Sequence, residues 1–320
     1  MEIVSSGLLL VVGLAILVLS ADWLIQASVK LSVLFKLTPL FIGLVVVAFG
    51  TSAPEAGVGI VAAIKNAKQI ALGNIVGSNI SNVGLILGLC ALVFPLKVNK
   101  NIFKRELPIM IFSVLLLYVL CFLGQGISRL DGAILIICFL LFCFISYRGA
   151  KEFFDFDEVD DFKFRKIFQR TNSRLFIFAL ALLSLIGIVI GADLMVRGGV
   201  KLAGIFGISP WIIGITIFAI GTSLPELVAS LTASFRKVPS ISVGNIVGSN
   251  IFNILFVLGI VALIRPIEIE PSVLRFEFPI LFIFSISLFI VMRTKYQITR
   301  KEGLVLFLGY LTFLFFLLRR

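Results

Sequence analysis

The chain consists of long apolar stretches separated by short polar segments. Most of these stretches reach the roughly 17 to 25 residues that a helix needs to cross a membrane, and none shows the strict alternation of a membrane barrel. We therefore expect an all-α polytopic membrane protein with ten spans, at about residues 3–35, 39–64, 70–94, 107–123, 132–147, 175–206, 210–235, 241–264, 278–292 and 304–318.

Composition supports this interpretation. Hydrophobic residues make up 60% of the chain and charged residues 14%, whereas soluble domains carry about 25% charged residues. The net charge of +11 arises from basic residues at the ends of the spans, which indicates membrane topology rather than nucleic-acid binding. The four cysteines have no paired spacing and histidine is absent, which argues against a disulfide framework or a zinc site. The N-terminus lacks the basic region of a cleaved signal peptide, so we expect the first span to be retained.

The two halves of the chain are an internal repeat. At a constant offset of 171 residues and without a gap, 31 of the 75 positions from Ala21 to Pro95 are identical to their counterparts. We therefore expect a five-helix unit at 1–148, a short loop at 149–173 and a second five-helix unit at 174–320. Because five is odd, the second unit should enter the membrane from the opposite side, as in the inverted repeats of secondary transporters.

The basic residues predict an orientation. If the N-terminus lies outside, 19 of the 28 Lys and Arg residues fall on the cytoplasmic side. The positive-inside rule then places both termini outside and the central loop in the cytoplasm. We expect an integral membrane protein. An acidic run at 155–161 in the loop lacks the glycine and ligand spacing of an EF-hand, so we interpret it as a solvated linker.

One motif occurs twice inside apolar stretches, as Gly-Thr-Ser-Ala-Pro-Glu at 50–55 and Gly-Thr-Ser-Leu-Pro-Glu at 221–226. Proline removes an N–H and crowds the carbonyl four residues earlier, so each span should break there. A carboxylate is costly at membrane depth and usually marks a functional site. A single copy fits a simple proline kink, but two copies that both keep glutamate favour one shared site.

A second repeated pattern lies on the following span of each half. Asn74, Ser78 and Asn82 recur every four residues and so share one helix face, and Asn245, Ser249 and Asn253 repeat this line. For Asn74 and Asn245 we expect hydrogen bonds between helices. The other four, with the two glutamates, supply only oxygen ligands, which suit Ca²⁺, Mg²⁺, Mn²⁺ or Na⁺ rather than zinc or copper.

These paired motifs and the ten-span repeat resemble the sodium/calcium exchanger branch of the cation/calcium antiporter superfamily, in its compact prokaryotic form. The resemblance implies an integral protein of a prokaryotic plasma or inner membrane. The resemblance implies that Glu55 and Glu226 are the principal ion ligands, and that the long first and sixth helices slide across a fixed core. It also implies a set of further ligands, namely Thr51, Ser52, Thr222, Ser223, Ser78, Ser249, Asn82, Asn253 and the carbonyls of Ala48 and Ala219. Some prokaryotic members carry aspartate where this chain has Asn253.

The leading hypothesis is an exchanger of Ca²⁺ for Na⁺ across the bilayer, with both ions as substrates, no prosthetic group and no obligate protein partner. Proton-driven exchange of Ca²⁺, Mg²⁺ or Mn²⁺ is a rival within the same class, and a passive cation channel is a rival outside it. An enzyme is not expected, because no pair of nucleophile and base is visible. Two further membrane acids, Asp22 and Asp193, should have structural roles, with Gln26 and Arg197 one turn later as their partners.

Overall fold

The structure is a computed structural model that describes residues 2–65, 68–98, 100, 102–124, 126–152, 162, 164–206, 219–269, 271–293 and 296–319. Nearly all of these residues are helical. Within these ranges seven helices are long and apolar enough to cross a membrane, or eight if one bent pair is counted as a single span. The chain is therefore a polytopic helical membrane protein.

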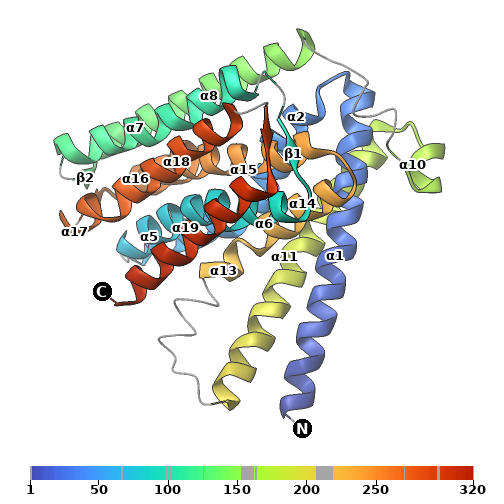
Figure 1. The fold of residues 1–320 in the computed structure, drawn as a ribbon, viewed down its shortest axis with the longest axis horizontal. Coiled ribbons are helices and arrows are strands. Elements are labelled where there is room, and N and C mark those ends of the chain that lie inside the picture. Colours follow the sequence, from blue (N-terminus) through green and yellow to red (C-terminus); the bar gives the residue numbers. More distant parts are fainter. Residues whose placement is uncertain are drawn as a thin grey trace.

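Two long helices, α1 (Glu2–Phe35) and α11 (Arg174–Ile205), lie side by side and extend away from the remaining helices (Figure 1). Glycine allows their backbones to approach closely. A Cβ atom placed on Gly191 would lie 2.8 Å from the carbonyl oxygen of Gly13 and 2.7 Å from the amide nitrogen of Leu17. Small residues at such contacts are typical of helix pairs in membranes.

The helix that carries Glu55 breaks as the sequence predicts. It consists of α2 (Pro39–Phe41), the π-helical η1 (Ile42–Val47), α3 (Ala48–Thr51) and α4 (Ala53–Ile64), with a bend of 46° at Ser52. In the second half α13 (Ala219–Thr222) and α14 (Leu224–Phe235) meet at Ser223 in the same way. Ser52 and Ser223 share a non-helical backbone, with φ and ψ near −85° and 7° and near −90° and 3°. The predicted span over 210–235 begins outside the described residues.

The next helix of each half widens into a π-helix at mid-length. In the first half α5 (Lys68–Ser81) continues as η2 (Asn82–Leu87) and α6 (Gly88–Val93). In the second half α15 (Pro239–Ile251) continues as η5 (Phe252–Val257) and α16 (Leu258–Ile264). The wider turns begin at or beside Asn82 and Asn253, and such π-turns inside helices are frequent at functional sites.

Two of the remaining helices extend clearly beyond the predicted spans at 132–147 and 304–318. Charged residues extend a helix beyond the membrane, so the apolar pattern marks the crossing rather than the helix ends. The predicted loop also contains a short helix, whereas its acidic run at 155–161 lies outside the described residues. The elements are η3 (Ile102–Glu106), α7 (Leu107–Gly124), α8 (Arg129–Glu152), α10 (Lys166–Arg170), α17 (Pro271–Arg275), α18 (Glu277–Arg293) and α19 (Arg300–Arg319).

Four two-residue strands, absent from the sequence prediction, join the two halves. Strand β1 (Leu96–Lys97) pairs antiparallel with β4 (Gln297–Ile298), and β2 (Gly126–Ile127) pairs antiparallel with β3 (Ile267–Glu268). The partners Leu96 and Ile298 correspond under the 171-residue offset to the partners Ile267 and Ile127. Each half therefore contributes one strand to each pair, in matching register.

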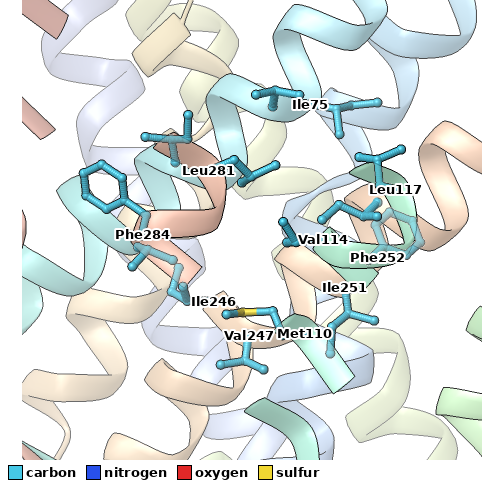
Figure 2. Packing of buried hydrophobic residues seen from close by; sticks show 14 of the residues in the cluster. Ile75, Met110, Val114, Leu117, Ile246, Val247, Ile251, Phe252, Leu281 and Phe284 are labelled. Carbon is cyan, nitrogen blue, oxygen red and sulfur yellow. The ribbon is translucent and has the colours of Figure 1, made fainter. Parts of the chain in front are cut away.

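Helix packing also crosses between the halves. Helix α8 packs on α16, and α19 packs on α6. A Cβ atom on Gly132 would lie 2.8 Å from the carbonyl oxygen of Gly259, and one on Gly303 would lie 2.8 Å from that of Gly88. Figure 2 shows side chains of both halves meeting in one buried cluster, among them Ile75, Met110, Val114, Leu117, Ile246, Val247, Ile251, Phe252, Leu281 and Phe284. This shared core holds the two broken helices against each other.

Candidate cation site

Glu55 and Glu226 lie in the first turns of α4 and α14, directly after the two helix breaks. Each glutamate is only 1% exposed. The N-terminal end of a helix favours negative charge, because its backbone N–H groups carry partial positive charge. The proline at the second position of each helix thus ends the preceding helix and starts a new one that supports the carboxylate.

Serine side chains connect each glutamate to the other half of the chain. Ser52 donates a hydrogen bond to Oε1 of Glu226 at 2.7 Å. Its counterpart Ser223 donates to Oε1 of Glu55 at 3.4 Å, and Ser78 approaches the same oxygen at 3.5 Å. Both carboxylates therefore lie at the contact between the halves, and Glu226 has the shorter hydrogen bond to the opposite half.

Several buried oxygen atoms in this region have no hydrogen-bond partner, namely Oε2 of Glu55, Oε2 of Glu226, Oγ1 of Thr222 and Oγ of Ser249. Burying such atoms without a partner is costly, and native structures rarely do so without a functional reason. Carboxylate and hydroxyl oxygens are ligands that Ca²⁺ prefers in proteins. Within the described ranges no group of three or more His, Cys, Asp or Glu side chains is placed to hold a metal ion.

Asn74 and Asn245 connect helices, as predicted from the sequence. Each Nδ2 atom donates to a backbone carbonyl, that of Glu55 and that of Glu226, at 3.4 Å in both cases. Asn245 also donates to Ser230 at 3.0 Å. The repeat has Gly59 at the position of Ser230, so only the second half can make this additional bond.

Thr51 and Ala48 take part in the local structure of the break. The Thr51 hydroxyl donates to Oδ1 of Asn245 at 3.1 Å and lies 3.4 Å from the carbonyl oxygen of Ala48. The same carbonyl accepts the N–H of Ser52 at 3.0 Å, which leaves its second lone pair for another partner. The carbonyl of Ala219 belongs to the first residue of α13.

Asn82 and Asn253 are buried at the start of the π-helical turns. Asn82 donates its Nδ2 to Oδ1 of Asn250 at 2.9 Å. Oδ1 of Asn82 and both side-chain polar atoms of Asn253 have no partner. Asn250 and its counterpart Asn79 are not among the predicted site residues. Both belong to a Gly-Ser-Asn run that occurs at 77–79 and again at 248–250, and this repeat is a signal from which they could have been found.

The two other acids lie outside this site and have the expected neighbours. Asp22 accepts from Gln26 at 3.0 Å, and Asp193 pairs with Arg197 at 2.8 Å. Asp22 has two further partners that the sequence did not reveal: Arg165, at 2.8 Å, and Arg236. Arg165 also donates its backbone N–H to Gln26 at 2.8 Å. Asp22 thus joins α1 to the central loop and to the end of α14.

A polytopic helical membrane protein with a buried glutamate pair between broken helices has the features of a cation transporter. The family model for "Sodium/calcium exchanger protein" matches residues 5–148 and 176–319. The chain is 35% identical to the sodium/calcium exchanger MaX1 of Methanosarcina acetivorans over 96% of this chain and 97% of that protein. It is also 35% identical to the inner membrane protein YrbG of Escherichia coli, over 96% of this chain and 94% of that protein.

A solved structure of the sodium-calcium exchanger NCX_Mj has the same fold. Its TM-score is 0.83 at 30% identity, over 97% of this chain and 98% of that chain. The chain therefore belongs to the sodium/calcium exchanger family.

Proposed function

We propose that this protein exchanges Ca²⁺ for Na⁺ across the membrane, with both ions bound between the two broken helices. The observation that carries the proposal is that each glutamate accepts a hydrogen bond from a serine of the opposite half, Glu226 from Ser52 and Glu55 from Ser223. Atom Oε2 of each glutamate is also buried without a hydrogen-bond partner. Relatives whose names describe sodium/calcium exchange support this choice of ions.

The charge of the site suits this exchange. Two carboxylates neutralise one Ca²⁺ or two Na⁺ ions, so either ion can enter without leaving a large net charge at membrane depth. Ca²⁺ takes six to eight oxygen ligands. The proposed ligands are Glu55, Glu226, Thr51, Ser52, Thr222, Ser223, Ser78, Ser249, Asn82, Asn253 and the carbonyls of Ala48 and Ala219.

Alternating access follows from the proposed architecture. We infer two inverted five-helix units, 1–148 and 174–320, joined by the loop at 149–173 and together forming ten spans. Two pairs of contacts support this arrangement. The 171-residue offset converts the strand pair β1–β4 into the pair β3–β2, and it converts the packing of α19 on α6 into a packing equivalent to that of α8 on α16. Helices α1 and α11 form a separate layer (Figure 1), so they can slide over the core and open the site to one side at a time.

The decisive experiment measures ⁴⁵Ca²⁺ uptake into proteoliposomes preloaded with Na⁺, with K⁺, or with a proton gradient. Uptake that requires internal Na⁺ supports the proposal. Uptake driven by protons supports the rival antiporter, and uptake that needs no ion on the opposite side indicates a channel. Competition by Mg²⁺ and Mn²⁺ in the same assay tests whether Ca²⁺ is the preferred divalent ion.

A further inference from the structure

Two buried asparagines are not among the proposed ligands. Asn79 and Asn250 occupy matching positions, one residue after Ser78 and Ser249. Asn79 is fully buried and Asn250 is 2% exposed. Neither residue contacts a glutamate through any hydrogen bond that the described residues make, so the proposed function does not account for them.

Asn250 fixes the orientation of Asn82. The Asn82 amide donates through Nδ2 to Oδ1 of Asn250 at 2.9 Å. Because Oδ1 and Nδ2 of an amide point in different directions, this bond turns Oδ1 of Asn82 away from Asn250. That oxygen is buried and has no partner, so it remains available to a cation.

Asn250 is itself held in place. Its Nδ2 atom lies 3.4 Å from the backbone carbonyl oxygen of Asn79 and 3.8 Å from the sulfur of Met110. A continuous chain of contacts therefore runs from the backbone of α5, through the side chain of Asn250 on α15, back to Asn82 at the start of η2. It crosses the contact between the halves twice.

The matching bond in the other direction is not formed. Under the 171-residue offset, the equivalent bond would run from Nδ2 of Asn253 to Oδ1 of Asn79. Neither of these two atoms has a hydrogen-bond partner. Asn79 instead donates its Nδ2 to the carbonyl of Ile75 in its own helix at 2.9 Å. The oxygen of Asn82 is thus fixed before an ion arrives, whereas the amide of Asn253 is not.

We propose that Asn250 is a positioning residue that sets the affinity for Ca²⁺ by holding the side-chain oxygen of Asn82 toward the ion, with no equivalent role for Asn79. This inference rests on the proposed function, since it takes Asn82 to be a ligand. Fixing a ligand in advance lowers the cost of ordering it on binding. Loss of Asn250 should therefore weaken Ca²⁺ binding more than it slows the transport cycle.

The test is a double-mutant cycle in proteoliposomes, with Asn250→Leu, Asn82→Ala and the double variant compared with the parent. Asn250→Leu should raise the half-saturating Ca²⁺ concentration roughly three- to tenfold, the usual effect of one hydrogen bond, and change the maximal rate less than twofold. In the Asn82→Ala background the same substitution should have less than a twofold effect. Asn79→Leu, the matched control, should change the half-saturating concentration less than twofold in the parent.

Equal effects of Asn250→Leu with and without Asn82 would overturn the proposal, as would an Asn79→Leu effect as large as that of Asn250→Leu. If Asn250→Leu does not give a folded protein, the cycle is repeated with Asn250→Ser, whose shorter side chain does not reach Asn82, and the same criteria apply. The parent protein separates the two hypotheses. Absence of Na⁺-driven Ca²⁺ uptake in the parent removes the proposed function, whereas normal uptake with additive variants removes only the role of Asn250.

Discussion

Ser52 donates to Glu226 at 2.7 Å, whereas its counterpart Ser223 lies 3.4 Å from Glu55. Two serines at equivalent positions of the repeat thus lie at different distances from the glutamate of the opposite half. Hydroxyl hydrogen bonds are strongest near 2.7 to 2.8 Å and weaken with distance. The halves of the site are therefore not equivalent, which agrees with the additional bond from Asn245 to Ser230 in the second half.

This difference predicts unequal effects of removing the two hydroxyls. Ser52→Ala deletes the short bond and should raise the half-saturating Ca²⁺ concentration roughly ten- to hundredfold, since hydrogen bonds to charged groups contribute about 1.5–3 kcal/mol. Ser223→Ala deletes a long bond and should have the smaller effect. Initial rates of ⁴⁵Ca²⁺ uptake over a range of Ca²⁺ concentrations measure both. A larger effect of Ser223→Ala would show that the described distances do not determine ion affinity.

The glutamate pair gives the second prediction. Glu55→Gln and Glu226→Gln should each abolish Na⁺-driven Ca²⁺ uptake, because a single carboxylate leaves a divalent ion with uncompensated charge at membrane depth. Gel filtration in detergent checks that the variants are folded. The exposed Glu2 provides the control, since Glu2→Gln should retain uptake. Near-normal uptake in either buried variant would remove that glutamate from the site.

The third prediction compares two aspartates at matching positions. The Asp22 side chain is 12% exposed and pairs with Arg165 and Arg236, whereas that of Asp193 is 51% exposed and pairs with Arg197. Asp22→Asn leaves two arginines without their charged partner and should lower the free energy of unfolding by about 1 to 3 kcal/mol. Asp193→Asn should change it by less than about 1 kcal/mol. Thermal unfolding in detergent measures both, and similar losses would argue against a special role for the Asp22 contacts.

The fourth prediction concerns the contact between α1 and α11. Gly191→Ala places a methyl group within 3 Å of the α1 backbone, which neither helix can avoid by turning a side chain. The two helices should move apart at a cost of about 1 to 3 kcal/mol, measured as a lower melting temperature. Gly7→Ala is the matched control, because nothing lies within 4 Å of its Cβ position. A variant at Gly191 as stable as the parent would mean that the helices are not packed this closely.

The fifth prediction tests the orientation. A cysteine replacing Thr171, in the central loop, should be shielded from a membrane-impermeant thiol reagent in intact cells and become labelled after permeabilisation. A cysteine replacing Ser5 should be labelled without permeabilisation. The four native cysteines lie within apolar helices, and the parent protein gives their background. Labelling of position 171 from outside would reverse the proposed topology.

The sequence predicted both broken helices and the two glutamates because the cause of each break is local. A proline in a helix removes a hydrogen bond wherever the helix lies. The regular spacing of Asn74, Ser78 and Asn82 likewise places them on one face without knowledge of the fold. In contrast, the contacts of Asn250 with Asn82 and of Arg236 with Asp22 join residues 168 and 214 positions apart. Such contacts depend on how the halves meet, which the pattern of one helix does not contain.

The strands were missed for a related reason. Leu96–Lys97 and its partners are too short to show alternation, and they become strands only because the opposite half supplies an edge. The π-helical turns at Asn82 and Phe252 are equally invisible in the sequence, since a single wide turn leaves the apolar pattern almost unchanged.

The strand pairs affect how the chain assembles. Because Leu96 pairs with Ile298 as Ile267 pairs with Ile127, the contact has the self-complementary form of a two-fold symmetric dimer. A free half would present both strand edges to another copy of itself, and exposed edges of this kind promote association. During synthesis, β1 and β2 leave the ribosome before their partners β4 and β3, so their edges stay unpaired until these strands of the second half are made.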